Sequence, residues 1–121
     1  HHPGELEALL DTARSLGYER VVCAFQPHTY TRTAALFDDF VEVLKKPDVI
    51  LLAEIFAARE DNESGISSRD LAERIPGARY FATLPEVTAA LRELARPGDL
   101  ILTVGAGDVY TVGEALVAGA N

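Results

Sequence analysis

The chain has 121 residues, enough for one domain of ordinary size and too few for two. Hydrophobic residues make up 48% and charged residues 25%, a mixture typical of a globular core and not of a disordered or fibrous chain. Eleven basic and nineteen acidic residues give a net charge of −8, which argues against a general binder of nucleic acid or of anionic membranes. A small phosphorylated ligand held at one local basic point remains compatible with this charge.

The single cysteine, Cys23, cannot form an internal disulfide or a cysteine-based zinc site. It lies in an apolar run, so we expect a small buried side chain, which suits a reducing compartment. No apolar run approaches the roughly 20 residues of a membrane span, and the first residues lack the pattern of a signal peptide. Because the sequence begins with His1-His2-Pro3 and not with Met, we expect a fragment or a processed product.

Helical and strand-like segments alternate from the start of the chain. Pro3 suits the first turn of a helix, and leucines recur at helical spacing up to Gly17, a natural stop. Residues 20–25 form an apolar, β-branched run that predicts a strand buried on both faces. A polar loop over residues 26–30 follows, and then a helix over about 31–44 with its apolar residues on one face.

The second half of the chain continues this alternation. Residues 48–55 predict a second buried strand, and the polar segment 58–66 predicts a loop. Ser67 and Asp70 have the spacing of a capping box, which starts a short helix. The remaining predicted elements are a strand over 78–82, a helix opened by Thr83 and Glu86 that runs to Ala95, a buried strand over 99–104 and a last helix over about 109–117.

Regular alternation of helices with short apolar strands indicates an α/β fold. We predict a single domain over residues 1–121, a Rossmann-like three-layer structure with a mostly parallel sheet and helices on both faces. Ligands of such folds bind outside the carboxyl ends of the strands. The segments at those ends are residues 26–32, residues 55–65, Thr83 and residues 105–108.

The loop Phe25-Gln-Pro-His-Thr-Tyr-Thr-Arg-Thr33 carries the richest chemistry of the chain. It places the His28 imidazole, the Tyr30 phenol and the Arg32 guanidinium within a few residues at the end of a strand. Arg32 is predicted in the first turn of a helix, where a cation opposes the macrodipole, so its position hints at an anionic ligand such as a carboxylate or phosphate. The alternative is a solvated loop in which Thr29 or Thr31 caps the helix.

Two further motifs are less specific. Glycines at 105 and 107 lie between a strand and a helix, but Tyr110 replaces the third glycine of a dinucleotide fingerprint and Asp108 would repel a pyrophosphate. We therefore favour a tight strand-to-helix connection. His1 and His2 are a purification-tag remnant, a disordered end or a functional pair, and no third ligand at metal spacing indicates a zinc site.

No complete catalytic set is visible in the sequence. The acidic segment 58–63 reads as a solvated loop whose carboxylates could hold an amine or a metal without local specificity. There is no Ser-His-Asp arrangement, nucleophile elbow or phosphate-binding P-loop. The residues alone thus predict a Rossmann-like domain with a polar rim that faces an anion.

Several motifs resemble the C-terminal domain of the Mur ligase family. The most specific is residues 25–33 followed by Leu36-Phe-Asp-Asp-Phe40, which is similar to the family member that adds L-alanine. Other matching segments cover essentially the whole chain: His1-His2-Pro3, Arg20-Val-Val-Cys-Ala24, Glu54-Ile-Phe-Ala-Ala-Arg-Glu60, Ile66-Ser-Ser-Arg-Asp-Leu71 and Gly98-Asp-Leu-Ile-Leu-Thr-Val-Gly-Ala-Gly-Asp108.

The resemblance implies a bacterial, cytoplasmic step of peptidoglycan synthesis. The whole enzyme would be an ATP- and Mg²⁺-dependent ligase that joins L-alanine to the lactyl carboxylate of UDP-N-acetylmuramic acid. ATP converts the carboxylate into an acyl phosphate, and the alanine amine attacks it through a tetrahedral intermediate and releases phosphate. This chain would be the third, amino-acid-binding domain beside an N-terminal and a central domain. It would be inactive by itself and would bind no cofactor tightly.

The resemblance also implies roles for individual residues. His1 and His2 would lie near the nucleotide phosphates, and His28 and Arg32 would face the same cleft, with Arg32 a partner for the alanine carboxylate or for the developing charge. Thr29 and Tyr30 would complete the substrate contacts, although some family members carry Arg at the position of Thr29, and Glu60 would border the site. The alternative function is a free-standing Rossmann-like module that binds a nucleotide or another anion.

Overall fold

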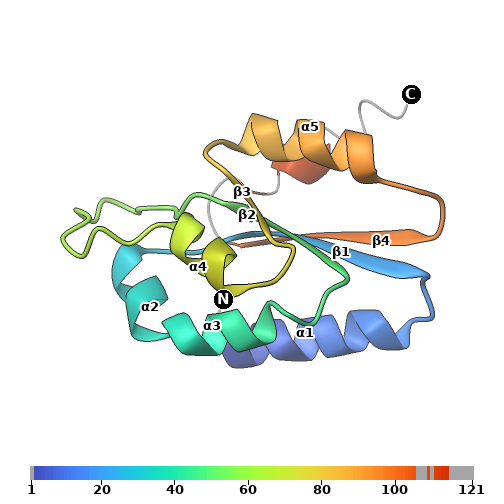
Figure 1. Cartoon of the computed structure of the whole chain (residues 1–121), viewed down its shortest axis with the longest axis horizontal. Helices are drawn as coiled ribbons and strands as arrows, with labels where there is room; N and C mark the ends of the chain where they lie inside the picture. The colour runs from blue at the N-terminus through green and yellow to red at the C-terminus, as the bar shows by residue number, and fades with distance from the viewer. Residues whose placement is uncertain (1, 106–108, 110, 115–121) are drawn as a thin grey trace.

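The computed structural model describes residues 2–105, 109 and 111–114 as a parallel sheet between two layers of helices (Figure 1). The elements are α1 (Pro3–Ser15), β1 (Arg20–Gln26), α2 (Tyr30–Ala35), α3 (Phe37–Val43), β2 (Val49–Ala53), α4 (Ser68–Arg74), β3 (Arg79–Phe81), α5 (Leu84–Leu94) and β4 (Asp99–Gly105). A further helical turn covers residues 111–114. The α/β prediction is confirmed.

Side chains of successive strand residues point to opposite faces of the sheet and build two cores. On one face Cys23, Phe25 and Leu52 pack against α1, α3 and α4. On the other face Val22 and Ala24 pack against α5. Both faces of the central strands are therefore covered, as their uninterrupted apolar sequences predict. No helix among the described residues is long and apolar enough to cross a membrane.

The strand order is β3-β2-β1-β4, and every pairing among the described strands is parallel. The chain steps from β1 to β2 to β3 with α2, α3 and α4 on one face, and then returns through α5 on the other face to place β4 beside β1. The order therefore reverses between β1 and β4. In open parallel sheets a ligand crevice forms at this point, outside the carboxyl ends of the two strands.

The strand order also corrects one expectation. The strand over 99–104 was predicted to be buried, but β4 lies at an edge of the described sheet, and of its residues only Val104 is fully buried. The strand over 48–55 is shorter than predicted because its two polar ends have other partners. Asp48 accepts a hydrogen bond from the Val21 N–H at 2.7 Å, and Glu54 turns to the start of α4.

The predicted helix over 31–44 is two helices. In the first of them, Thr33 donates both its hydroxyl, at 2.7 Å, and its backbone N–H, at 3.2 Å, to the Thr29 carbonyl. The break falls at Leu36, after which α3 begins at Phe37. The sequence pattern hid this break because the apolar side chains continue across it: Leu36 at the break and Phe37 at the start of α3 pack against the same core.

The predicted helix starts are confirmed where a capping side chain precedes them. Ser67 and Asp70 form the reciprocal capping box of α4. Thr83 accepts a hydrogen bond from the Glu86 N–H at 3.4 Å and caps α5. These short-range patterns fix where the connections end and so fix the length of the loops at the carboxyl edge.

Candidate functional site

Two loops from neighbouring strands are tied together at the carboxyl edge of the sheet. His28, after β1, and Phe56, after β2, form an isolated parallel bridge. The Phe56 N–H donates to the Pro27 carbonyl at 2.9 Å, and the Thr29 N–H donates to the Phe56 carbonyl at 2.8 Å. The imidazole of His28 stacks on the Phe56 ring with the centroids 5.7 Å apart and an interplanar angle of 15°. The His28 ring is therefore held in a defined orientation.

Thr29 adopts a backbone conformation that side chains rarely take. Its φ is +65°, which is unusual for any residue other than glycine and especially for a β-branched one. The residue is also the N-cap of α2, because its hydroxyl oxygen accepts a hydrogen bond from the Arg32 N–H at 3.3 Å. Of the two threonines considered as caps, Thr29 fills the role. Strained residues held by their surroundings are concentrated at functional sites.

Glu60 joins the second loop to the start of α2. Its carboxylate accepts hydrogen bonds from the Thr31 N–H at 3.0 Å and from the Thr31 hydroxyl at 2.5 Å. These bonds, the hydroxyl first, lower the pKa of Glu60. Beside this contact lies an open hollow of about 470 Å³, whose lining residues are Tyr30, Thr31, Ala34, Glu60, Asp61, Glu63 and Ser64. The segment 58–63 is thus more than a solvated loop, because it holds α2 in place.

Arg32 is exposed on α2 and forms no ion pair with any residue that the structure describes. The macrodipole argument made for it does not hold. Since α2 has only six residues, Arg32 also lies in the last turn of this helix, where a cation is favoured. Its availability for an anion therefore rests on its exposed, unpaired guanidinium and not on helix electrostatics.

Glu54 organises the start of the second loop, a role that the sequence reading missed. Its carboxylate accepts hydrogen bonds from the Tyr80 hydroxyl and the Ser67 hydroxyl, both at 2.6 Å, and from the Ser68 N–H at 3.1 Å. Burial opposes ionisation of Glu54, but these bonds outweigh it and lower the pKa of the carboxyl group. The contacts join the end of β2 to β3 and α4, and no local sequence motif predicts them.

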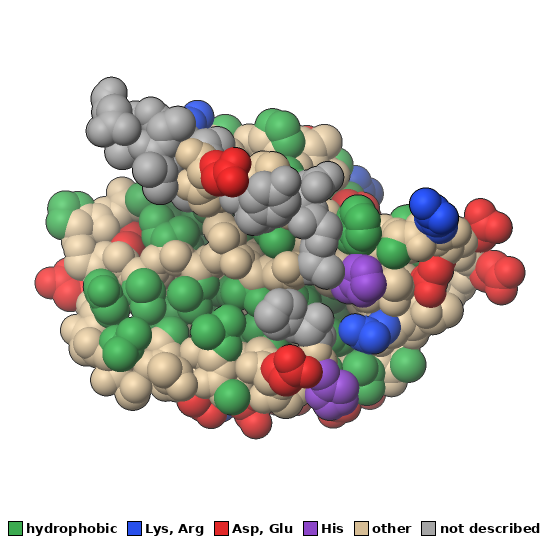
Figure 2. All heavy atoms as spheres, turned by 180° about the vertical axis from the view of Figure 1, so that it is seen from behind, with side chains coloured by type: hydrophobic (Ala, Val, Ile, Leu, Met, Phe, Trp, Pro, Cys, Tyr) green, Lys and Arg blue, Asp and Glu red, His purple; other side chains and the backbone are tan. Residues whose placement is uncertain are grey.

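His2 lies on a different element, as the N-cap of α1. Its Nδ1 accepts a hydrogen bond from the Gly4 N–H at 3.1 Å, so the neutral ring carries its proton on Nε2 and presents a donor. His2 also lines a hollow of about 280 Å³ with Glu7, Asp39 and Glu42. Figure 2 shows the histidine side chains at one end of the face seen from behind, with a basic side chain between them. His1 lies outside the described residues.

The glycine-rich segment after β4 is described only at its start. Gly105 has a φ of +145°, and a Cβ there would lie 2.6 Å from the Gln26 carbonyl oxygen. This position requires glycine because of close backbone packing between β1 and β4, consistent with a tight connection. Residues 106–108 and 110 lie outside the described part of the chain, as do residues 115–117 at the end of the last predicted helix.

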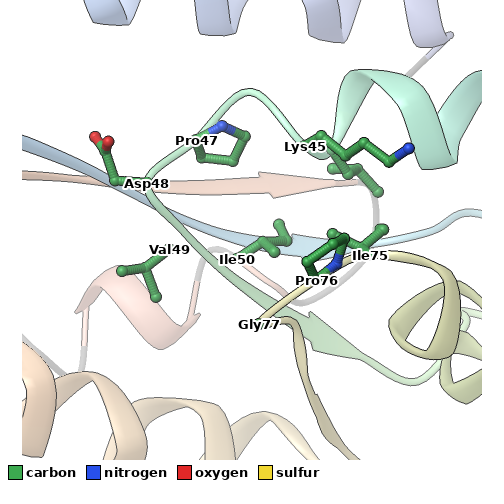
Figure 3. A pocket seen from close by; sticks show the side chains of 9 residues that line it. Lys45, Pro47, Asp48, Val49, Ile50, Ile75, Pro76 and Gly77 are labelled. Atoms are coloured by element: carbon green, nitrogen blue, oxygen red, sulfur yellow. The ribbon is translucent and has the colours of Figure 1, made fainter.

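Other parts of the described structure carry less chemistry. Within residues 2–105, 109 and 111–114, no three His, Cys, Asp or Glu side chains are grouped to hold a metal ion. A hollow of about 260 Å³ lies at the opposite, amino-terminal edge of β2 (Figure 3). Its walls include Ile50 and Ile75, and the Asp48 carboxylate points away from them. We therefore place the candidate site at the carboxyl edge.

Comparison with known proteins shows the family of the chain. Residues 1–107 match the model of the Mur ligase family described as the Mur ligase, glutamate ligase domain. Curated relatives named UDP-N-acetylmuramate–L-alanine ligase include one from Agathobacter rectalis, 46% identical over 121 residues and 97% of this chain, and one from Acetivibrio thermocellus, 47% identical over 118 residues and 94% of this chain. The chain spans about a quarter of the length of these relatives, 26% and 25%.

A solved structure shares the fold. It is a domain from Haemophilus ducreyi assigned provisionally to a UDP-N-acetylmuramate:L-alanyl-gamma-D-glutamyl-meso-diaminopimelate ligase. It superposes with a TM-score of 0.73 at 16% sequence identity, over all of this chain and 85% of the solved one. The family match over most of the sequence decides the assignment: the chain belongs to the Mur ligase family and corresponds to its glutamate ligase domain.

Proposed function

We propose that the chain is the C-terminal, amino-acid-binding domain of an ATP-dependent ligase that joins L-alanine to UDP-N-acetylmuramic acid in bacterial peptidoglycan synthesis. The observation that carries this proposal is the 46% identity, over 97% of the chain, to a protein named UDP-N-acetylmuramate–L-alanine ligase. The N-terminal and central domains of the longer protein would bind the UDP-sugar and ATP with Mg²⁺. The reaction would take place in the cytoplasm.

In this reaction ATP is a substrate that activates the lactyl carboxylate as an acyl phosphate. The amine of L-alanine attacks the acyl carbon, an amide bond forms, and inorganic phosphate leaves. We assign Mg²⁺, together with ATP, to the central domain. The task left to this chain is to hold the amino acid and to stabilise charge at the reacting centre.

Arg32 is the residue best suited to the carboxylate of the amino acid. Its guanidinium is exposed and unpaired among the described residues, and it stands four positions after His28, whose ring Phe56 fixes. A guanidinium can bind a carboxylate through two parallel hydrogen bonds. Thr29 and Tyr30 lie between these two residues in the sequence and add a hydroxyl and a phenol for further contacts.

His2 is suited to an oxygen atom of a phosphate. Because its Nδ1 accepts from the Gly4 N–H, the Nε2–H of the neutral ring is a donor and cannot take up a proton from the amine. We therefore assign His2 a binding role and no role as general base. His1 precedes it and is proposed to act beside it.

The test of the proposed function uses the complete enzyme and follows phosphate release that depends on L-alanine. Substitution Arg32→Ala is expected to raise KM for L-alanine about tenfold or more, because a charge-assisted, two-pronged contact is lost, while KM for ATP changes little. The matched control is Arg74→Ala, which removes an exposed arginine with one long ion pair of 3.8 Å to Asp38.

Two results would contradict the proposal. Unchanged kinetic constants in Arg32→Ala would remove Arg32 from the site. Absence of L-alanine-dependent phosphate release from the unsubstituted enzyme would remove the ligase activity itself. The alternative, a free-standing module for a nucleotide, requires strong ATP binding to the 121-residue protein alone, and calorimetry of that protein measures it directly.

A further inference from the structure

One carboxylate closes the base of the loop that extends from the end of β2, residues 55–66 (Figure 1). Glu54 directly precedes this loop, and its Oε1 accepts hydrogen bonds from the N–H of Ile55 at 3.0 Å and from the N–H of Ser68 at 3.1 Å. Its Oε2 accepts from the Ser67 hydroxyl at 2.6 Å. The carboxylate therefore ties the first residue of the loop to the residues that follow its last, as in an Ω-loop with closely spaced ends.

Strand β3 anchors this clamp to the sheet. The Tyr80 hydroxyl donates to Glu54 Oε2 at 2.6 Å, and the guanidinium of Arg69 lies over the Tyr80 ring, 4.9 Å from its centre. The backbone N–H of Glu54 donates to the Phe81 carbonyl at 3.1 Å. The side chain and the backbone of Glu54 are thus both held by β3, so the base of the loop is attached to the sheet.

Between its clamped ends, the loop carries both contacts that hold the proposed substrate-binding segment. Phe56 follows the clamped Ile55 directly, bonds through its backbone to residues on either side of His28, and stacks on the His28 ring. Glu60 holds Thr31 at the start of α2. A shift of the loop base would therefore move the supports of His28 and of α2 together.

The middle of the loop is strained and depends on its ends for its shape. Ala58 and Arg59 have φ of +50° and +74°, and the Glu60 N–H donates to the Ala57 carbonyl at 3.0 Å. Two positive φ values inside such a turn are typical of type I′, which favours glycine and asparagine. Strained backbone persists only where its surroundings impose it, and here the clamp is part of what holds Glu60 in place.

We propose that Glu54 is a positioning residue of the ligase. This inference rests on the proposed function. By clamping the loop, Glu54 keeps His28 and the α2 residue Arg32 in the arrangement that binds the amino acid. Glu54 is assigned no contact with the substrate and acts through Phe56 and Glu60. Loss of the clamp should therefore weaken the binding of L-alanine and leave the binding of ATP by the central domain largely unaffected.

Asp48 provides a matched control at the opposite end of β2. It directly precedes this strand, as Glu54 directly follows it. Its carboxylate accepts a hydrogen bond from the Val21 N–H at 2.7 Å and pairs with Arg14 at 3.2 Å. Removal of Asp48 thus deletes a carboxylate that holds backbone beside the same strand, but at the amino edge of the sheet, away from the proposed substrate contacts.

The experiment measures phosphate release by the complete enzyme. Glu54→Ala is expected to raise KM for L-alanine about tenfold and KM for ATP less than about twofold. Glu54→Gln should stay close to the unsubstituted enzyme, because its amide oxygen still accepts from the two N–H groups and the hydroxyls can turn to accept from its NH₂. Tyr80→Phe removes one hydroxyl and is expected to raise KM for L-alanine about threefold, so the test does not depend on the folding of Glu54→Ala.

Hydrogen exchange of the complete enzyme, followed by mass spectrometry, provides a second measurement. Residues 27–33 are expected to exchange about tenfold faster in Glu54→Ala, although none of them contacts the Glu54 carboxylate, because the support from Phe56 and Glu60 is loosened. Asp48→Ala should leave both this exchange and KM for L-alanine unchanged, even where it lowers the melting temperature.

Three results would overturn the positioning role. These are an unchanged KM for L-alanine in both Glu54→Ala and Tyr80→Phe, an equal rise of KM for L-alanine and ATP, and an Asp48→Ala variant that raises KM for L-alanine as much as Glu54→Ala does. If the unsubstituted enzyme releases no phosphate with L-alanine, the proposed function fails. The exchange of residues 27–33 still decides in that case whether Glu54 positions this segment.

Discussion

The carboxylate of Glu60 holds both the backbone N–H and the hydroxyl of Thr31, at 3.0 and 2.5 Å. Twenty-nine residues separate the two along the chain. The contact fixes the start of α2, and with it Tyr30 and Arg32, against the loop that follows β2. The loop that carries the proposed ligand contacts is therefore positioned from a different strand.

Removal of this contact should affect ligand binding more than folding. In the complete enzyme, Glu60→Ala is expected to raise KM for L-alanine several-fold, because α2 loses the partner that orients it. Glu60→Gln keeps one acceptor oxygen, so its KM for L-alanine should stay much closer to that of the unsubstituted enzyme. Melting temperature should change little, since the contact is exposed. The control is Glu73→Ala on α4, which removes an equal charge. An equal change of KM in both variants would contradict the positioning role.

The strained Thr29 leads to a prediction on stability. Thr29 combines a φ of +65° with a capping hydroxyl. Glycine tolerates this backbone and costs only a few tenths of a kcal/mol as a cap, whereas alanine loses the cap and keeps the strain. We expect Thr29→Gly to be more stable than Thr29→Ala by about 1–2 kcal/mol. Urea unfolding of the 121-residue protein measures the difference, and equal stability of the two variants would show that the strain is not stored here.

The sequence contains the information for elements whose signals are local. The capping residues Ser67 and Thr83 predict the starts of α4 and α5, and the apolar runs predict β1 and β2. The break at Leu36 escaped prediction because the apolar pattern continues across it, with Leu36 and Phe37 packed against the same core as Phe40. The prediction that β4 is buried was also wrong. An edge strand can have the same apolar sequence as a central strand, and only the number of neighbouring strands distinguishes the two.

The candidate site was only partly predictable for a related reason. His28, Thr29, Tyr30 and Arg32 adjoin one another in the sequence and end a predicted strand, so the rule for parallel sheets located them. The contacts that hold them come from Phe56 and Glu60, about thirty residues away. Sequence spacing does not show which residue of the loop after β2 will contact which residue of the loop after β1. These contacts follow from the register in which β1 pairs with β2.

Cys23 provides a test of the buried core. The thiol is completely buried on the α1 side of the sheet, and this burial raises its pKa to about 12. Because the thiolate is the reactive form, we expect no reaction of the native protein with a disulfide reagent at pH 8 over minutes. In denaturant the rate should rise about a hundredfold or more. Rapid labelling without denaturant would show that the sheet opens at β1 far more readily than its packing implies.

The acid stability of the fold should depend on Asp99. Arg20 donates to both carboxylate oxygens of Asp99, at 2.8 and 2.7 Å, and the Arg96 N–H donates at 2.9 Å. The bonds from Arg20, ahead of the opposing effect of burial, lower the pKa of Asp99 below its usual 3.8. A carboxylate with a lowered pKa stabilises the fold fully above 3.8, and this stabilisation is lost as the pH falls from 3.8 through the lower pKa of the folded state.

The substitution Asp99→Asn should therefore lower the free energy of unfolding at neutral pH, and this loss should become smaller as the pH falls. Urea unfolding at pH 7, 5, 4 and 3 compares the variant with the unsubstituted chain, and the gap in unfolding free energy is expected to stay constant from pH 7 to 5 and to narrow below pH 4. Glu73→Gln on α4 serves as the exposed control. A gap that stays constant down to pH 3 would mean that Asp99 stabilises the β1–β4 pair through its shape and hydrogen bonds and not through its charge.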